Sequence, residues 1–150
     1  MLDKFYIPFF EATCNVFFLM LDLSEITDQP AERGEFDGAL SISIGVIGDL
    51  EGEVIYRFPQ ETSLAMVNIM SGMEMDSVDE FVTSAISEIA NIISGNVLTM
   101  LAEKDFKCDI LPPKLCKADD SDKEYSYQNC CCLSTTVGGV CLDIRLNHVK

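Results

Sequence analysis

The sequence predicts an α+β domain in which long helices pack on a mostly antiparallel sheet. Two patterns predict this class: a long amphipathic stretch in the middle of the chain, and segments of alternating polarity joined by glycine-containing turns. The elements follow one another as a helix, strands, two helices and strands, which suits one layered structure. With 150 residues, 48% of them hydrophobic, the chain fits a single domain over residues 1–150.

The chain begins with a predicted helix over about residues 7–20, and Pro8 suits its first turn. Phe10, Cys14, Phe17 and Phe18 share the predicted apolar face of this helix, with Phe9, Ala12 and Val16 near its edges. Residues 21–27 are compatible with a short strand. Residues 28–38 contain a proline and two glycines and predict a polar loop.

A hairpin is predicted next. Residues 39–47 alternate, with Leu40, Ile42, Ile44 and Val46 on one side and serines and a glycine on the other. Residues 48–52 form the predicted turn, and residues 53–58 return as the second strand. The small residues leave room for a helix, although a solvent-facing side fits them equally well.

Two helices are predicted after the hairpin. The first spans residues 62–70, with Leu64, Val67 and Met70 inward, and Gly72 can take the left-handed conformation that ends it. The second spans residues 77–104, and Asp76 or Ser77 is the predicted N-cap. Its apolar face consists of Val78, Val82, Ala85, Ile86, Ile89, Ala90, Ile93 and Val97.

A narrow polar line runs along the other side of the central helix: Ser84, Glu88, Asn91 and Gly95. At 100° per residue these four positions lie within about 60° of one another. The shoulders of this polar line are small residues: Ser87, Ala90 and Ser94. Because nothing bulky borders the line, another protein's surface can lie against it. Glu88 and Asn91 stand one turn apart and can act on one partner group.

The C-terminal part predicts strands. Residues 106–111 form one strand, which Pro112 and Pro113 end. Residues 117–124 form an acidic, solvated loop. Residues 125–135 and 140–146 predict two antiparallel strands joined at Gly138 and Gly139.

The charge of the chain excludes several kinds of partner. The net charge is −15, with 25 acidic and 10 basic residues, so a nucleic-acid backbone or an anionic membrane surface would be repelled. The first 23 residues lack the basic start and unbroken apolar run of a signal peptide, and no stretch approaches a membrane span. We therefore expect a cytoplasmic protein with no nucleic-acid or membrane partner.

Seven cysteines are the unusual feature of the composition. Cys130, Cys131 and Cys132 are consecutive in a predicted strand, so they cannot converge on one metal ion without distortion. The chain has no Cys-x-x-Cys pair and one histidine, His148. A redox or zinc protein is thus disfavoured, and we expect reduced thiols that serve as small hydrophobic side chains.

The central helix carries the pattern Ser-x-x-x-Glu-x-x-Asn, and Pro113 follows Asn91 after 21 intervening residues. This arrangement resembles the motif of the CheC/CheX/FliY phosphatases of bacterial chemotaxis. Three further segments are similar to their CheX counterparts: residues 8–13, 44–48 and 58–62. The resemblance covers about residues 5–147, and the single copy of the motif resembles CheX rather than CheC.

The resemblance implies a fold, a substrate and partners. The fold is a CheC-like α/β sandwich, and CheX members pair into a homodimer through their sheets. The substrate is the phosphorylated aspartate of a CheY-like response-regulator receiver domain. No cofactor or metal is expected on this chain, and Mg²⁺ belongs to the acidic pocket of the partner receiver.

Within that reaction, the residue types suggest separate roles. A carboxamide both donates to and accepts from a water, so Asn91 can orient the attacking water. Glu88 can pair with a lysine beside the phosphorylation site and dock the helix. Glu88 as general base is less attractive, because a loose transition state needs little deprotonation of the water. Ser84 and Gly95 are expected to contact the partner.

A second function class fits the same residues. The domain could be a CheX-like binding module that docks on a receiver or on a chemotaxis or motor complex without hydrolysis. The presence of both Glu88 and Asn91 favours the enzyme, since an adaptor has no evident need for the pair.

Overall fold

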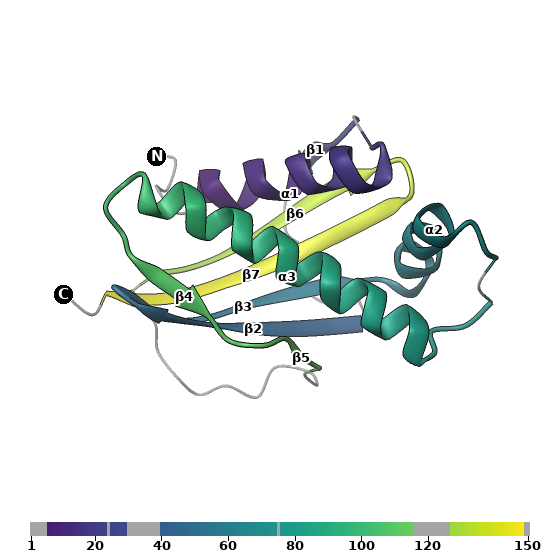
Figure 1. Ribbon diagram of the computed structural model, residues 1–150. Coiled ribbons are helices and arrows are strands. Elements are labelled where there is room, and N and C mark those ends of the chain that lie inside the picture. The colour runs from purple at the N-terminus through teal and green to yellow at the C-terminus, as the bar shows by residue number, and fades with distance from the viewer. Residues whose placement is uncertain (1–5, 24, 30–39, 75, 116–126, 149–150) are drawn as a thin grey trace.

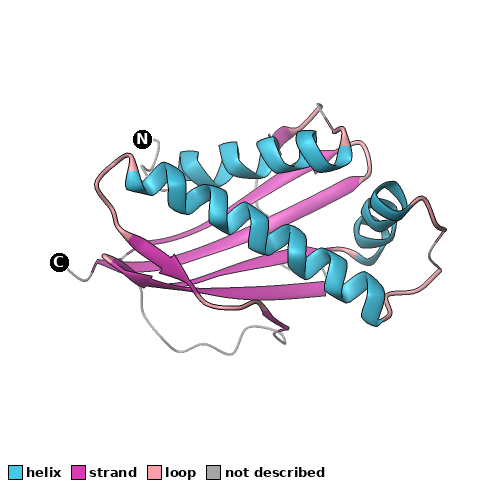
Figure 2. Ribbon diagram, viewed as in Figure 1, coloured by secondary structure: helices cyan, strands magenta, loops and turns pink. Residues whose placement is uncertain are grey.

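Helices cover one face of an antiparallel sheet, which confirms the predicted fold class (Figures 1 and 2). The computed structural model describes residues 6–23, 25–29, 40–74, 76–115 and 127–148. Helices α1 (Tyr6–Leu21) and α3 (Glu80–Ala102) lie across the sheet. Helix α2 (Gln60–Ser71) lies at the end of the sheet, next to the N-terminal part of α3.

The sheet has the strand order β1-β6-β7-β3-β2-β4, and β5 also pairs with β2. The strand bounds are β1 Thr27–Gln29, β2 Leu40–Gly48, β3 Leu50–Phe58, β4 Cys108–Ile110, β5 Lys114–Leu115, β6 Tyr127–Thr135 and β7 Gly138–His148. All pairings are antiparallel. The two long hairpins, β2–β3 and β6–β7, meet through the β3–β7 pairing and form the centre of the sheet.

The first hairpin confirms the predicted strands and refines the turn. Pairing between β2 and β3 runs from Leu40 opposite Phe58 to Val46 opposite Gly52. Beyond that pair the chain remains extended, because Gly48 pairs outward with β4 and Leu50 pairs with β7. Residues that were predicted as a free turn therefore extend the sheet on both sides.

The predicted alternation of the hairpin is confirmed. Side chains on one face of the sheet enter the core beneath the helices: Ile42, Ile44, Val54, Tyr56, Phe58, Leu142 and Ile144. Small residues of β2 lie on the opposite face. There the side chain of Leu111, rather than a helix, packs against Gly45. A Cβ at position 45 would come within 2.8 Å of that side chain.

Helix α1 matches its predicted bounds to within one residue, but its buried side is shifted toward one edge of the predicted apolar face. Phe9, Ala12 and Phe17 are buried, whereas Phe18, predicted to lie on that face, is 53% exposed. Thr13 also lies in the buried stripe, because its hydroxyl donates to the Phe9 carbonyl at 2.7 Å and so needs no water. The apolar pattern of α1 is nearly continuous, which made its inward side ambiguous.

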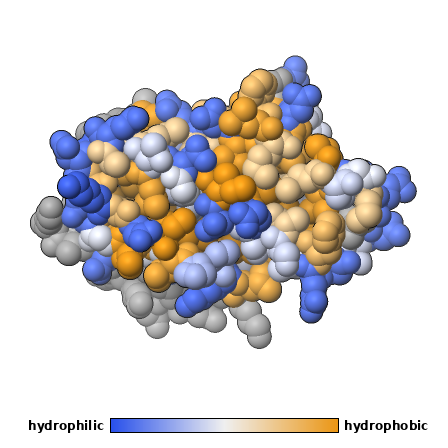
Figure 3. Space-filling model, in the orientation of Figure 1, coloured by the Kyte–Doolittle hydropathy of each residue, from blue (hydrophilic) through white to orange (hydrophobic). Residues whose placement is uncertain are grey.

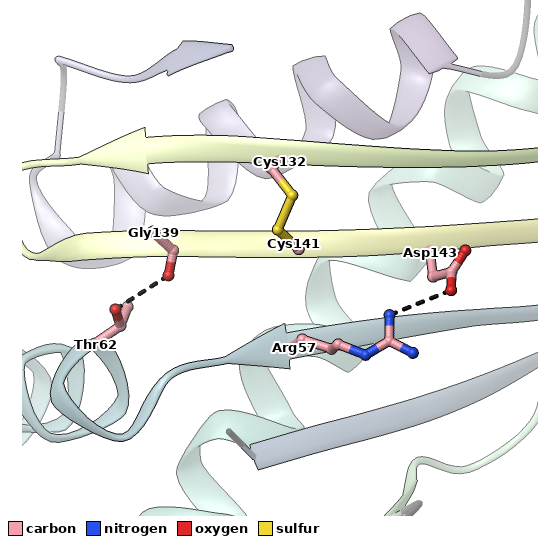
Figure 4. The surroundings of a disulfide bond; sticks show 6 residues. All are labelled: Arg57, Thr62, Cys132, Gly139, Cys141 and Asp143. Atoms are coloured by element: carbon pink, nitrogen blue, oxygen red, sulfur yellow. Dashed lines mark hydrogen bonds and ion pairs between the residues drawn. A yellow bond between two sulfur atoms is a disulfide. The ribbon is translucent and has the colours of Figure 1, made fainter. Parts of the chain in front are cut away.

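Helix α2 also faces the core differently from the prediction. The buried residues are Thr62, Ser63, Met66 and Val67, and neither Leu64 nor Met70 is fully buried. The Thr62 hydroxyl donates to the Gly139 carbonyl at 3.0 Å, which satisfies a buried polar group and ties α2 to β7 (Figure 4). The predicted end is confirmed: Gly72 has φ 72° and donates to the Asn68 carbonyl.

Several boundaries differ from the prediction. The predicted strand over residues 21–27 is not observed among its described residues, since α1 continues to Leu21 and β1 begins only at Thr27. Gly138 and Gly139 lie in β7, so the second hairpin turns at residues 136–137, two residues earlier than expected. The two-residue strand β5 was not predicted. Most of the predicted loop 28–38 and all of 117–124 lie outside the described residues.

The expectation that no stretch of the chain approaches the length of a membrane span is wrong for helix α3. By length and composition alone, its 23 residues are long and apolar enough to cross a bilayer. In the fold, however, its apolar side packs against the sheet and α1. The length and hydropathy of α3 are those of a central core helix.

The face of the sheet away from the helices carries a disulfide and buried charges (Figure 4). Cys132 and Cys141 lie directly opposite each other on β6 and β7 and are bonded, so the prediction that all thiols are reduced is wrong for this pair. Asp143 accepts from Arg57 at 3.2 Å and from Arg145 at 2.8 Å. The Arg57 pair links β3 to β7 across the centre of the sheet, whereas Arg145 lies on β7 together with Asp143.

Two other cysteines agree with the expectation of reduced thiols. Cys14 and Cys108 are free and half-buried. Burial raises the pKa of both thiols, which keeps them protonated and weakly reactive.

Reduction of the Cys132–Cys141 disulfide should lower the free energy of unfolding by about 2 kcal/mol, because the bond closes a short loop in the unfolded chain. Urea denaturation with and without dithiothreitol measures this difference. The double variant Cys132→Ala/Cys141→Ala is the control, and its midpoint should not respond to dithiothreitol. Identical midpoints for the wild-type protein under both conditions would contradict the expectation.

Candidate functional site

Helix α3 begins at a well-defined cap. The Asp79 carboxylate accepts from the backbone N–H of Val82 at 2.9 Å, and Glu80 lies in the first turn. The predicted caps, Asp76 and Ser77, are therefore wrong by two or three residues. Asp79 is the N-cap because its backbone is extended and its side chain reaches the N–H of the third helical residue, as an N-cap requires. This cap fixes where the helix starts, and hence which residues face outward.

The inward side of α3 follows the predicted apolar pattern. Its buried residues are Val82, Ile86, Ile89, Ala90, Ile93, Ser94, Val97 and Leu101. Ala90 and Ser94, assigned also to the shoulders of the polar line, lie on the buried side. The exposed strip is consequently narrower on one side than the sequence suggested.

The polar line faces away from the sheet. Ser84 and Glu88 are exposed, and Asn91 and Gly95 are half-buried. A Cβ built on Gly95 would meet nothing within 4 Å, so the surface there is open. In Figure 3 hydrophilic surface lies over the middle of α3, with hydrophobic surface on either side. All four predicted positions therefore lie on one accessible strip.

The side chains of Glu88 and Asn91 are uncommitted. Within the described part of the chain, neither makes a side-chain hydrogen bond or an ion pair. An exposed carboxylate and a carboxamide one helical turn apart can bind one cationic group and one water at neighbouring points. The arrangement suits recognition of a polar pocket presented by another molecule.

A buried hydrogen bond holds α3 beneath this strip. The hydroxyls of Tyr56 on β3 and Ser94 on α3 lie 2.8 Å apart, and both side chains are buried. Among the described residues, this is the one hydrogen bond between side chains that joins α3 to the sheet. Because Ser94 comes one turn after Asn91, the bond fixes the rotation of α3 close to the polar line.

The sequence patterns did not predict the pairing of Tyr56 with Ser94. Tyr56 shares the inward phase of Val54 and Phe58, so its burial was predictable, and a buried tyrosine needs a partner. The identity of that partner depends on how far α3 is shifted along the sheet, which a helical pattern does not specify.

The other candidate features lie apart from the polar line. Pro113 is half-buried in the link between β4 and β5, at a turn position as expected. Within the described ranges, no group of three or more His, Cys, Asp or Glu side chains could hold a metal ion.

Comparison with known proteins gives a consistent family. The family described as "Chemotaxis phosphatase CheX" matches residues 40–136. The CheY-P phosphatase CheX of Thermotoga maritima is 37% identical over 87 residues, which cover 57% of this chain and 56% of that protein. The match thus spans little more than half the length of that relative.

Solved structures share the fold over nearly the whole chain. Chemotaxis protein CheX from Vibrio vulnificus has a TM-score of 0.81 at 24% identity and covers 97% of this chain and 100% of its own. A CheX-CheY-BeF3-Mg complex from Borrelia burgdorferi has a TM-score of 0.76 at 23% identity, with coverages of 97% and 99%. At sequence identities below 25%, these two matches show the common fold alone.

Removing the Tyr56 hydroxyl should test the anchor of α3. We expect Tyr56→Phe to lower the free energy of unfolding by about 1–2 kcal/mol, because the buried Ser94 hydroxyl loses its partner. Chemical denaturation of Tyr56→Phe, Ser94→Ala and the double variant gives the coupling energy. Strictly additive losses would contradict an interaction between the two hydroxyls.

The same variant should change the alkaline limit of stability. Burial raises the pKa of the Tyr56 hydroxyl, although its bond to Ser94 acts in the opposite direction. An unfolded tyrosine ionises near pH 10, so the stability from Tyr56 is complete below about pH 10 and falls as the pH rises above it. Tyr56→Phe should flatten that part of the stability profile.

Proposed function

This chain belongs to the CheX family of chemotaxis phosphatases, and we propose that it hydrolyses the aspartyl phosphate of a CheY-like receiver domain. The name of the Thermotoga maritima relative, CheY-P phosphatase, supports the substrate class. The Borrelia burgdorferi complex of CheX with CheY supports the kind of partner. Such a reaction takes place in the cytoplasm, where response regulators act.

The accessibility of Glu88 and Asn91 carries this proposal. Both side chains project from a helix whose other side is fixed in the core, and neither is committed to a bond within the described chain. Gly95, one turn beyond Asn91, leaves space for a partner to approach. A phosphorylated pocket can therefore reach the two side chains without rearrangement of this fold.

The chemistry follows from the reactivity of the substrate. An aspartyl phosphate is an acyl phosphate that water already attacks, so a catalyst gains most by holding the water in line with the leaving carboxylate. The carboxamide oxygen of Asn91 accepts a hydrogen bond from the water, and its NH2 group donates a hydrogen bond to the water oxygen or to the phosphoryl group. The amide stays neutral at every physiological pH, so this role needs no titrating group.

Glu88 and its neighbours supply the docking. A lysine beside the phosphorylated aspartate pairs with the Glu88 carboxylate, and this ion pair aligns α3 over the pocket. Ser84 and Gly95 extend the contact along the polar line. The Mg²⁺ ion belongs to the receiver and neutralises charge on the phosphoryl oxygens.

Asn91→Ala should lower the rate of receiver dephosphorylation by at least about a hundredfold, close to the intrinsic rate of the receiver, because the attacking water loses its orientation. Release of inorganic phosphate from a phosphorylated CheY receiver measures this rate. Asn96→Ala is a matched control, because Asn96 is an amide of the same helix that bonds to the Ile92 carbonyl. Wild-type turnover by Asn91→Ala would remove the proposed role.

Glu88 should act differently in the same assay. Glu88→Ala is expected to raise KM more than it lowers kcat, since it removes the docking ion pair. Glu103→Ala, which removes an exposed carboxylate beyond the end of α3, controls for the change in net charge. An effect on kcat alone would instead favour Glu88 as a general base.

The proposal includes a homodimer formed through the sheets. Three apolar side chains are exposed on the β2 side of the sheet: Ile47 at 43%, Leu111 at 41% and Leu115 at 61%. Their exposure in the single chain supports contact with a second copy there. Size-exclusion chromatography with light scattering should give twice the 16.6 kDa mass of the chain, and Leu115→Glu should shift it toward the monomer. A monomeric wild-type protein at tens of micromolar would contradict the dimer.

A further inference from the structure

Phe81 is an exposed aromatic side chain in the first turn of α3. Its relative exposure is 48%, although most large apolar residues of this helix are buried. The fold does not account for this position, because the N-terminal end of α3 is already capped by Asp79 and packed through Val82. Contact with a partner would remove the exposed apolar area of this phenylalanine from water, which is favourable.

Phe81 continues the polar line toward the N-terminus of α3. Glu88 comes seven positions after Phe81, which is nearly two turns, so the two side chains lie within about 20° of each other around the helix axis. Along the axis they are about 10 Å apart. Any partner that contacts Glu88 and Asn91 and extends toward the start of α3 therefore reaches Phe81.

The size of protein interfaces requires such an extension. A specific complex buries about 800 Å² on each partner, far more than Glu88 and Asn91 provide. Toward the C-terminal end the line offers Gly95 and the exposed Thr99, which have little apolar area. Toward the N-terminal end it offers Phe81, and binding energy concentrates in aromatic side chains that become fully desolvated.

Neighbouring residues of α2 enlarge this apolar end of the surface. Ile69, Met70 and Met73 are 43%, 36% and 51% exposed; the first two lie in the last turn of α2, and Met73 follows that helix before α3 begins. Figure 1 places α2 beside the N-terminal part of α3, and in Figure 3 hydrophobic surface continues from α3 toward α2. Three more large hydrophobic side chains are therefore exposed in, or just after, the helix that packs beside α3.

We propose that Phe81 is the apolar anchor for the same receiver domain that presents its phosphorylated aspartate to Glu88 and Asn91. This inference rests on the proposed function for the identity of the partner. The receiver must carry an apolar patch about 10 Å from its phosphorylation site, measured along α3. Because burial of Phe81 is independent of charge, it provides affinity that salt does not screen, whereas the Glu88 pair is weakened by salt.

Binding of a receiver that cannot turn over separates this inference from the catalytic proposal. A CheY receiver activated with beryllofluoride and Mg²⁺ is titrated with the wild-type protein, Phe81→Ala, Phe81→Leu and Leu19→Ala. Leu19 is the matched control, because it is an apolar residue that is 76% exposed and belongs to α1 rather than to the helix that carries the polar line. Circular dichroism verifies that each variant is folded.

We expect Phe81→Ala to raise Kd at least about tenfold, with Phe81→Leu intermediate and Leu19→Ala within about twofold of wild type. The tenfold loss should persist at high salt. Equal Kd values for Phe81→Ala and wild type would overturn the anchor, whatever the hydrolysis rate. A third outcome is that the wild-type protein binds the receiver but does not hydrolyse its phosphate, while Phe81→Ala loses binding. That outcome would support the anchor and refute the phosphatase. Failure of the wild-type protein to bind would overturn both.

Discussion

The packing of α3 against the sheet determines where every proposed functional residue lies. A helix has a fixed angular period, so burial of Val82, Ile86, Ile89 and Ile93 forces the positions half a turn away to face outward. The Asp79 cap sets where the helix starts, and the Tyr56–Ser94 hydrogen bond sets its rotation on β3. The polar line is thus a consequence of the core rather than a separate structure.

The rest of the fold supports that helix from below and from the side. The pairing of β3 with β7 joins two hairpins into one broad surface, and α1 packs alongside α3 on it. On the far face, the buried Asp143 of β7 pairs with Arg57 of β3 and so ties the same two strands together. A rigid platform matters for the proposed reaction, because a misplacement of the water by one ångström costs much of the rate.

The sequence predicted the parts of the molecule that follow from periodicity. Alternation in β2 and the helical pattern of α3 correctly gave the strand faces, the core residues and the outward direction of Glu88 and Asn91. Where apolar residues are too dense or too few, as in α1 and α2, the pattern did not select the buried side. There, individual hydrogen bonds of Thr13 and Thr62 decided which residues the core accepts.

Contacts between distant segments could not be predicted from periodicity. The Cys132–Cys141 disulfide depends on the register of β6 against β7, and the Tyr56–Ser94 bond depends on the placement of a helix over a strand. The cytoplasm, which is the proposed location, keeps most thiols reduced, so a disulfide is unusual there. The Cys132–Cys141 disulfide lies on the face of the sheet away from the polar line, so its redox state need not affect docking.

A structure of this protein bound to a beryllofluoride-activated CheY receiver with Mg²⁺ tests the central claim most directly. The account predicts that the receiver pocket lies over α3, with the Asn91 carboxamide beside the beryllofluoride group and Glu88 paired with a receiver lysine. A receiver seated on α1 or on the helix-free face of the sheet, with Glu88 and Asn91 still exposed to solvent, would contradict it.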